Sequence, residues 1–199
     1  MYSAFEPQVD IAEKPLKDRK RKRNKPVGNE PDFNLRLYLY QMTGVDLTQI
    51  DGINALTVQT VLSEIGLDMS KWKTVKHFSS WLSVCPYNDI TGGKVIKSGT
   101  KKSQNRAAKS LRLAARSLSH SDSYLGAFFR RIKARSDAPT AITATAHKLA
   151  RIIYAMLRDQ SEYIDPGADF FEEQYRQRAV KNLERKAKKL GFTVVPVTA

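Results

Sequence analysis

The sequence has a single cysteine, three histidines and no long hydrophobic run. Cys85 alone cannot form an internal disulfide, and His77, His120 and His147 are too scattered for a zinc site. No apolar run approaches the roughly 20 residues that span a bilayer, and no signal-peptide stretch opens the chain. We therefore expect a soluble, intracellular protein without a metal site of its own.

Acidic residues are also scarce. The 199 residues include 20 Asp and Glu against 34 Lys and Arg, for a net charge of +14. Between Asp89 and Asp122, 32 residues contain eight cations and no carboxylate, which is more than half of the net excess. Concentrated positive charge is typical of a nucleic-acid partner. Ribosomal, chromatin-like and membrane-surface proteins share it, so charge alone leaves these classes open.

Strand patterns are few, because Val95-Ile96 is short and the apolar stretch 192–197 is interrupted by Pro196. Helical patterns dominate, and prolines such as Pro139 fall between them, where proline is tolerated. The sequence therefore predicts a mostly α, multi-helix domain. The expected helices cover residues 33–42, 55–65, 75–84, 103–119, 124–135, 140–158 and 168–190.

The first 31 residues contain few large apolar side chains and a cationic run at residues 17–25. Such a segment cannot bury enough apolar surface to offset its ordering entropy. We expect residues 1–31 to form a basic, disordered tail and residues 32–199 to form the helical domain. The cationic run is either a solvated charged segment or a phosphate-binding arm or import signal.

A helix-hairpin-helix-like pattern lies between residues 47 and 62, where a short helical turn and a tight turn precede an amphipathic helix. Gly52 and Asn54 occupy the tight turn, where free amides and a helix N-terminus could receive a DNA phosphate. Asp51 beside them would repel phosphate. A purely structural turn with Gly52 as its hinge is the alternative reading.

The expected helix at residues 103–119 has one apolar and one basic side. Ala107, Leu111, Ala114 and Leu118 share the apolar side at helical spacing. The cations of the other side are Arg106, Lys109, Arg112 and Arg116. A solvated face is the ordinary reading of such a stripe, but the lack of acids for i, i+4 pairing favours phosphate contacts.

A loop is expected at residues 86–94, where Thr91 precedes Gly92, Gly93 and Lys94. Two glycines allow a bulky substrate to approach the backbone closely. The spacing does not satisfy the Walker pattern, which argues against nucleotide hydrolysis. Three further lysines that could contact a nucleic-acid backbone follow the loop, namely Lys97, Lys101 and Lys102.

Two smaller sets of residues carry weaker signals. His147 and Arg151 share a helix face and could contact phosphate, although a partly buried histidine on a packed helix is the commoner case. Six aromatic side chains are expected in the core rather than as base-stacking platforms, namely Trp72, Trp81, Phe128, Phe129, Phe170 and Phe171.

Several stretches together resemble the C-terminal domain of a bacterial insertion-sequence transposase. The strongest are residues 85–94, from Cys85 through Thr91-Gly92-Gly93-Lys94, then 105–108 and 111–115. Stretches at 42–47, 125–131 and 143–151 match as well, so the resemblance runs from about residue 33 to 193. The family is numbered one hundred and ten among insertion sequences and is related to the Piv/MooV recombinases.

The resemblance implies a bacterial, nucleoid-associated DNA recombinase that cuts and rejoins strands during transposition. Family members use a guide RNA, act as multimers, and carry an N-terminal RuvC-like domain that binds magnesium. The family's nucleophilic serine maps onto Thr91, whose extra methyl crowds an in-line attack. The 199 residues leave no room for the RuvC-like domain, so we expect no cofactor within the chain and incomplete chemistry from the chain alone.

Two rival functions follow from the residues without the resemblance. The chain could be a non-catalytic nucleic-acid-binding module that uses Gly52 and the basic helix. It could instead be an adaptor whose basic face meets an acidic protein partner.

Overall fold

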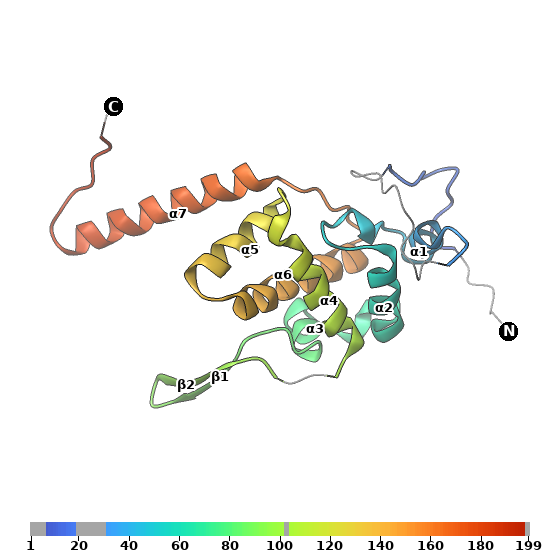
Figure 1. Cartoon of the computed structure of the whole chain (residues 1–199), viewed down its shortest axis with the longest axis horizontal. Helices are drawn as coiled ribbons and strands as arrows, with labels where there is room; N and C mark the ends of the chain where they lie inside the picture. Colours follow the sequence, from blue (N-terminus) through green and yellow to red (C-terminus); the bar gives the residue numbers. More distant parts are fainter. Residues whose placement is uncertain (1–6, 19–30, 102–103, 198–199) are drawn as a thin grey trace.

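The computed structural model describes residues 7–18, 31–101 and 104–197, and these form seven α-helices, three short 3-10 helices and one β-hairpin. Figure 1 shows a helical body from which the hairpin and the last helix project. The α-helices are α1 (Leu35–Thr43), α2 (Ala55–Ile65), α3 (Val75–Trp81), α4 (Arg106–Ser117), α5 (Tyr124–Arg135), α6 (Ala138–Asp159) and α7 (Ala168–Lys189). The 3-10 helices are η1 (Leu47–Gln49), η2 (Met69–Lys71) and η3 (Leu118–His120), and the strands are β1 (Tyr87–Thr91) and β2 (Lys94–Gly99).

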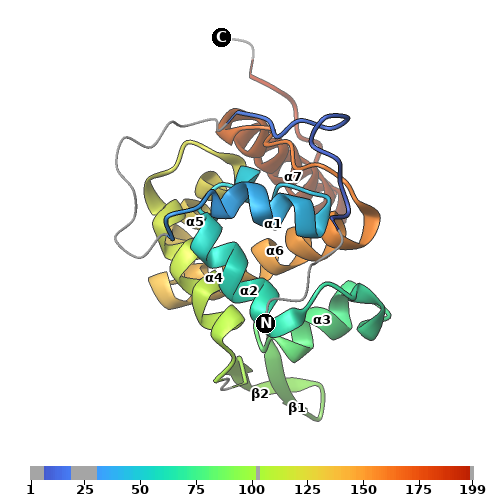
Figure 2. The ribbon, with the colours of Figure 1, turned by 90° about the vertical axis from the view of Figure 1, so that its right-hand side faces the viewer.

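The core is centred on α4, which packs against both α2 and α6 (Figures 1 and 2). Ala107, Leu111, Ala114 and Leu118 are all buried, so the predicted apolar side of this helix is confirmed. Small alanine side chains allow neighbouring helices to approach closely, while Leu111 fills the space between them. Helix α6 supplies Leu149 and other fully buried residues to the same core.

Capping side chains set several helix boundaries. The bounds of α2 and α5 agree with the sequence prediction, whereas α4 begins at Arg106 because the Asn105 side chain accepts the amide of Ala108 at 3.2 Å. Helix α6 begins at Ala138, after the Asp137 side chain caps the amide of Thr140 at 2.7 Å. Pro139 therefore lies in the first turn of α6 rather than between helices, at a position where its missing amide costs nothing.

The segment after α3 differs most from the sequence prediction. The helix expected to reach residue 84 ends at Trp81, and Ser83 adopts a positive φ of 55°. The loop expected at residues 86–94 is instead β1 and the turn that joins it to β2, an antiparallel strand of six residues. Helical periodicity is absent here, but a two-stranded ribbon with exposed residues on both faces lacks the half-buried alternation by which strands are predicted.

Residues 7–18 lie against the helical body, although the sequence assigned them to the disordered tail. The backbone amide of Gln8 donates to the Gln41 carbonyl at 2.8 Å, and Lys14 Nζ donates to the Gly44 carbonyl at 3.2 Å. Arg36 of α1 donates to the Lys17 carbonyl at 2.6 Å. Backbone groups make much of this contact, which composition does not reveal. The rest of the predicted tail lies outside the described residues, and the domain boundary at residue 31 stays a prediction.

The aromatic residues expected in the core divide into two groups. Trp72, Phe129 and Phe171 are buried, and Phe128 is half-buried. Trp81 and Phe170 are 43% and 49% exposed. Among the described helices, none combines the length and the apolarity that crossing a bilayer would require.

Candidate nucleic-acid interface

Thr91 lies at the tip of the projecting hairpin, as the last residue of β1 and the cross-strand partner of Lys94 (Figure 1). Gly92 and Gly93 form the two-residue turn, with φ of 56° and 75°. Two successive positive φ angles characterise the type I′ turn, which glycine adopts without strain. A Cβ on either glycine would meet no atom within 4 Å, so the turn backbone is open to an approaching ligand.

The hairpin tip does not contain an assembled acid-base pair. Within the described part of the chain, the Thr91 hydroxyl takes part in no hydrogen bond, and β1 is exposed along its whole length. A threonine hydroxyl is a weak nucleophile until a base removes its proton. Thr91 is therefore accessible but not activated by the residues around it.

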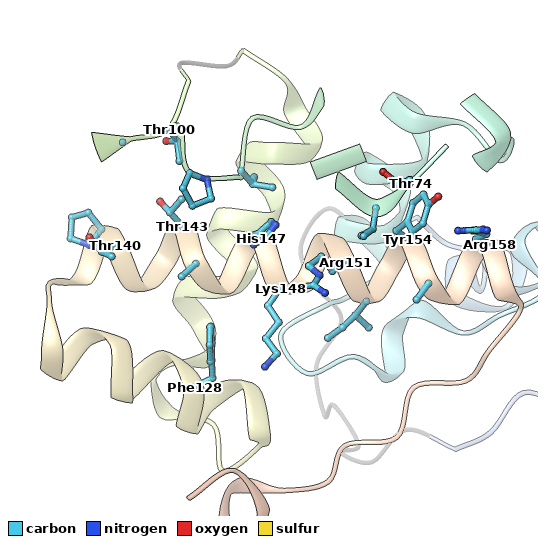
Figure 3. Close-up of a pocket in the computed structure, with 18 of the residues that line it drawn as sticks. Thr74, Thr100, Phe128, Thr140, Thr143, His147, Lys148, Arg151, Tyr154 and Arg158 are labelled. Carbon is cyan, nitrogen blue, oxygen red and sulfur yellow. The ribbon is translucent and has the colours of Figure 1, made fainter. Parts of the chain in front are cut away.

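A groove of about 1050 Å³ runs along α6 and reaches the base of the hairpin (Figure 3). Pro86, Gly99 and Thr100 bring the two ends of the hairpin to its rim, while Phe128 of α5 forms part of the opposite wall. The residues of α6 that line the groove include Thr140, Thr143, His147, Lys148, Arg151 and Arg158. Hydroxyl, imidazole, ammonium and guanidinium groups thus share one open surface, and among the described residues that line it Asp159 is the one carboxylate.

His147 and Lys148 are held in place by the groove walls. Burial lowers the pKa of His147, and the neighbouring charge of Arg151 lowers it further, so the imidazole is neutral at physiological pH. Lys148 Nζ lies 3.0 Å from the Tyr124 hydroxyl and 4.1 and 4.4 Å from the ring centroids of Tyr124 and Phe128. These contacts orient the ammonium group against the two rings.

Arg151 is the cation of the groove most available to a ligand. Its side chain is exposed, and no carboxylate of the described residues lies within 4.0 Å of its guanidinium group. Arg158, also exposed, lies 3.8 Å from Asp159 and stacks loosely over Tyr154 at 5.9 Å. A free guanidinium group can bind two phosphate oxygens at once, which favours Arg151 as a backbone contact.

The four cations predicted on α4 do not line this groove. Arg106 forms an ion pair with Glu64 of α2 at 2.5 Å, and Arg112 donates to the Ser83 carbonyl at 3.0 Å. Lys109 and Arg116 are exposed and make no ion pair with a described residue. The sequence showed no acid at i, i+4 spacing on this helix, but Glu64 of the neighbouring helix takes that place for Arg106.

Gly52 and Asn54 have clear structural roles. Gly52 has a φ of 83°, and a Cβ there would lie 2.9 Å from the Ala114 carbonyl oxygen of α4. The Asn54 side chain caps α2 by accepting the amide of Thr57 at 2.8 Å. The predicted order of helical turn, tight turn and helix is present as η1, residues 50–53 and α2. The predicted DNA contact of this element stays a prediction.

Three lysines of the acid-free segment, between Asp89 and Asp122, remain to be placed in the structure. Lys101 Nζ lies 4.9 Å above the Tyr87 ring, beside the first residue of β1. Lys97 belongs to β2, but its side chain is outside the described atoms, and Lys102 lies outside the described residues. Contacts of these three lysines with a nucleic-acid backbone stay predictions.

The groove on α6 is only partly predictable from the sequence. Thr140, Thr143, His147 and Arg151 recur at steps of three, four and four, which places them on one side of a helix. That spacing was visible in the sequence. The contribution of the hairpin base was not, because it depends on the packing of segments about 50 residues apart in the chain.

Residues 46–130 match the family model described as the transposase IS116/IS110/IS902 family. The match covers less than half of the chain and is consistent with a transposase domain of this family in that segment. The transposase segment begins at Asp46, includes the hairpin and α4, and ends within α5. No curated protein matches the chain at a significant level.

This match supports a general role in transposition and implies an interaction with DNA. The transposase segment supplies the hairpin and part of the groove lining on both sides of α6, including Thr74, Val84 and Phe128. The cations of the groove come from α6, which follows the matched segment.

Proposed function

We propose that this chain is the C-terminal, strand-transferring part of a transposase, which holds a DNA backbone against the α6 groove and presents Thr91 to a phosphodiester. The observation that supports this proposal most strongly is the position of Thr91. It lies exposed at the tip of a hairpin whose base opens onto a groove that contains Arg151, an arginine with no ion-pair partner among the described residues. A nucleophile must reach a phosphate that cations already hold in place.

In the proposed reaction the Thr91 hydroxyl oxygen attacks the phosphorus of one strand. A bond between Thr91 and phosphorus forms as the bond to one bridging oxygen breaks. The hydroxyl proton leaves to a base, and the departing oxygen gains a proton to become a strand-end hydroxyl. Attack by the hydroxyl of a second strand end then reverses these bond changes, joins the strands and frees Thr91.

The base for this reaction is not among the described neighbours of Thr91, which supports a requirement for a second domain. No group of three or more His, Cys, Asp or Glu side chains among the described residues could hold a metal ion. The residues described here therefore do not fit the magnesium that the family resemblance implies, and we derive no step through it. An RuvC-like partner domain is the proposed source of the missing acid-base groups.

The family resemblance also leads us to propose a guide RNA as a partner. Its phosphates have the same chemistry as those of DNA, so Arg151 and Lys148 would be suitable contacts for either strand. Sequence selection would then rest on base pairing rather than on side chains of this chain.

A non-catalytic nucleic-acid-binding module is the second candidate. It is favoured by the threonine at the nucleophile position and by the lack of a hydrogen-bonded base at its hydroxyl. The same groove would then bind the backbone, and no bond would be made or broken.

Covalent capture distinguishes these two functions. The full chain, an RuvC-like domain of the same family, guide RNA and magnesium are incubated with a labelled DNA strand, and denaturing gels are used to detect a protein-DNA adduct. We expect an adduct with the native chain, none with Thr91→Ala, and a larger yield with Thr91→Ser, because serine lacks the methyl group that crowds in-line attack.

Val95→Ala provides the control for damage to the hairpin, because Val95 is an exposed residue of β2 next to the turn and has neither a hydroxyl nor a charge. If the control variant loses both the adduct and the salt-dependent DNA binding, the substitutions damage the hairpin in general. An adduct that persists in Thr91→Ala would exclude Thr91 as the nucleophile. Binding without any adduct, even for Thr91→Ser, would establish the non-catalytic module instead.

A further inference from the structure

Helix α7 extends well beyond the helical body (Figure 1). Its first turns pack against α5, where Phe171 is buried and its ring lies 5.1 Å from that of Tyr124. Farther along the helix, Val180 and Leu183 are 43% and 55% exposed. Most helical stability in proteins comes from packing of an apolar face rather than from intrinsic propensity. The projecting half of α7 therefore has an apolar face that the described residues of this chain leave exposed.

The two halves of α7 carry opposite charge. Residues 168–175 contain three acids, Asp169, Glu172 and Glu173, and no cation. Residues 176–189 contain seven cations and a single acid, Glu184. A parallel pair of such helices would place the two basic halves side by side, whereas an antiparallel pair would place each acidic half against a basic one.

The charges are also spaced symmetrically about Ala179. Asp169 and Lys189 are each ten residues from it, Glu172 and Lys186 seven, and Glu173 and Arg185 six. Every acid of the first half thus has a cation at the mirrored position of the second half. A two-fold axis at Ala179 makes the Glu172–Lys186 pair, on the face of Ala179, and the flanking Asp169–Lys189 pair twice, whereas Glu173 and Arg185 lie about 120° round the helix from that face.

Apolar residues are also spaced symmetrically about Ala179. Tyr175 and Leu183 each lie four residues from Ala179, and Ala168 and Leu190 each lie eleven. The small side chain of Ala179 would let the two helices approach closely at the axis. Leu183 of one copy would cover the exposed side of Tyr175 in the other, where Arg131 already stacks on the ring at 3.6 Å.

We propose that two copies of this chain associate through antiparallel pairing of α7 about a two-fold axis at Ala179. The projecting half of each helix lies on the half of the other that is docked on α5. Asp169 has no ion-pair partner among the described residues and is available to Lys189 of the second copy. Glu172 already pairs with Arg131 at 2.7 Å, so Lys186 of the second copy extends an existing pair. The pairing is independent of strand transfer and of Thr91.

Disulfide trapping tests the orientation of the pair. Tyr175→Cys and Leu183→Cys are made separately in a full-length Cys85→Ser background and carry tags of different size. When the two are mixed and oxidised, antiparallel pairing gives the mixed disulfide between the two tags. Parallel pairing gives disulfides only between two copies that carry the same tag. Either that result or the absence of any disulfide overturns the proposal.

Sedimentation velocity without nucleic acid tests the contacts. We expect a dimer for the native chain, loss of the dimer in Leu183→Asp and in Asp169→Lys, and recovery when Asp169→Lys is combined with Lys189→Asp. Leu113→Asp is the matched control, because Leu113 is an exposed leucine on α4, remote from α7 in the sequence. Native protein that stays monomeric at micromolar concentrations, or dimerises only when DNA is added, would assign the basic half of α7 to nucleic acid and overturn the proposal.

Discussion

At the scale of single residues, a buried ion pair between Asp46 and Arg36 has a structural role that the residue types alone do not indicate. Asp46, the first residue of the transposase segment, forms a buried ion pair with Arg36, and each side chain is only 10% exposed. The same arginine donates to the Lys17 carbonyl, so one guanidinium group joins η1, α1 and the N-terminal residues. The sequence shows both charges but does not indicate that they meet.

This pair gives the folded chain a defined response to acid. Burial raises the pKa of Asp46, but hydrogen bonds from Arg36 and Thr48 and the charge of Arg36 outweigh it and hold the pKa below the ordinary 3.8. The unfolded state therefore binds more protons than the folded state in acid. The stabilisation is complete above the ordinary pKa and is lost as the pH falls through the lower, folded value.

We expect Asp46→Asn to lower the free energy of unfolding at neutral pH by about 3–5 kcal/mol, because it leaves Arg36 buried without its counter-charge. The variant should also lack the part of the acid dependence that Asp46 contributes. Urea unfolding at pH 7 and in acid measures both effects. Asp159→Asn, which removes an exposed ion pair with Arg158, is the control and should cost at most about 1 kcal/mol. Equal losses in the two variants would contradict the assignment.

At the scale of elements, helices were predictable and the hairpin was not. The periodicity of α2, α4 and α5 follows directly from residues that the fold buries, and local caps such as Asn105 adjust the ends by a few residues. Gly92-Gly93 was recognisable as a flexible pair. Its function as a type I′ turn was missed because β1 and β2 are exposed on both faces and therefore show no strand alternation.

Asn54 allows the structural and DNA-contacting roles of the element around α2 to be separated. Aspartate caps a helix about as well as asparagine, so Asn54→Asp should leave stability nearly unchanged, whereas Asn54→Ala should cost about 1 kcal/mol. Because the amide of Thr57 is already bound by the cap, we expect the added negative charge to leave DNA affinity unchanged. Thermal unfolding and fluorescence anisotropy measure the two effects. A marked loss of affinity in Asn54→Asp would show that a phosphate binds at this helix end.

At the scale of the whole molecule, positive charge is divided among the hairpin, the α6 groove, the outer side of α4 and the far half of α7. The acid-free segment of the sequence predicts the charge of the hairpin and of α4. His147 and Arg151 of the α6 groove are only a weaker signal in the sequence. The groove depends on α6 passing beneath the hairpin base, a contact between distant segments that no local pattern encodes. Charge counting along the chain located cations but could not distinguish Arg106, which Glu64 neutralises, from Arg151.

The most direct test of a phosphate-binding groove is the salt dependence of DNA binding by Arg151→Gln and by Arg135→Gln. Arg135 is also an exposed arginine, at the end of α5, and it does not line the groove. Binding of the native chain should weaken steeply between about 50 and 200 mM salt. Arg151→Gln should bind more weakly and reduce the log-log slope by about 1, while Arg135→Gln should match the native chain. A native slope in Arg151→Gln, or an equal reduction in both variants, would contradict a phosphate site in the groove.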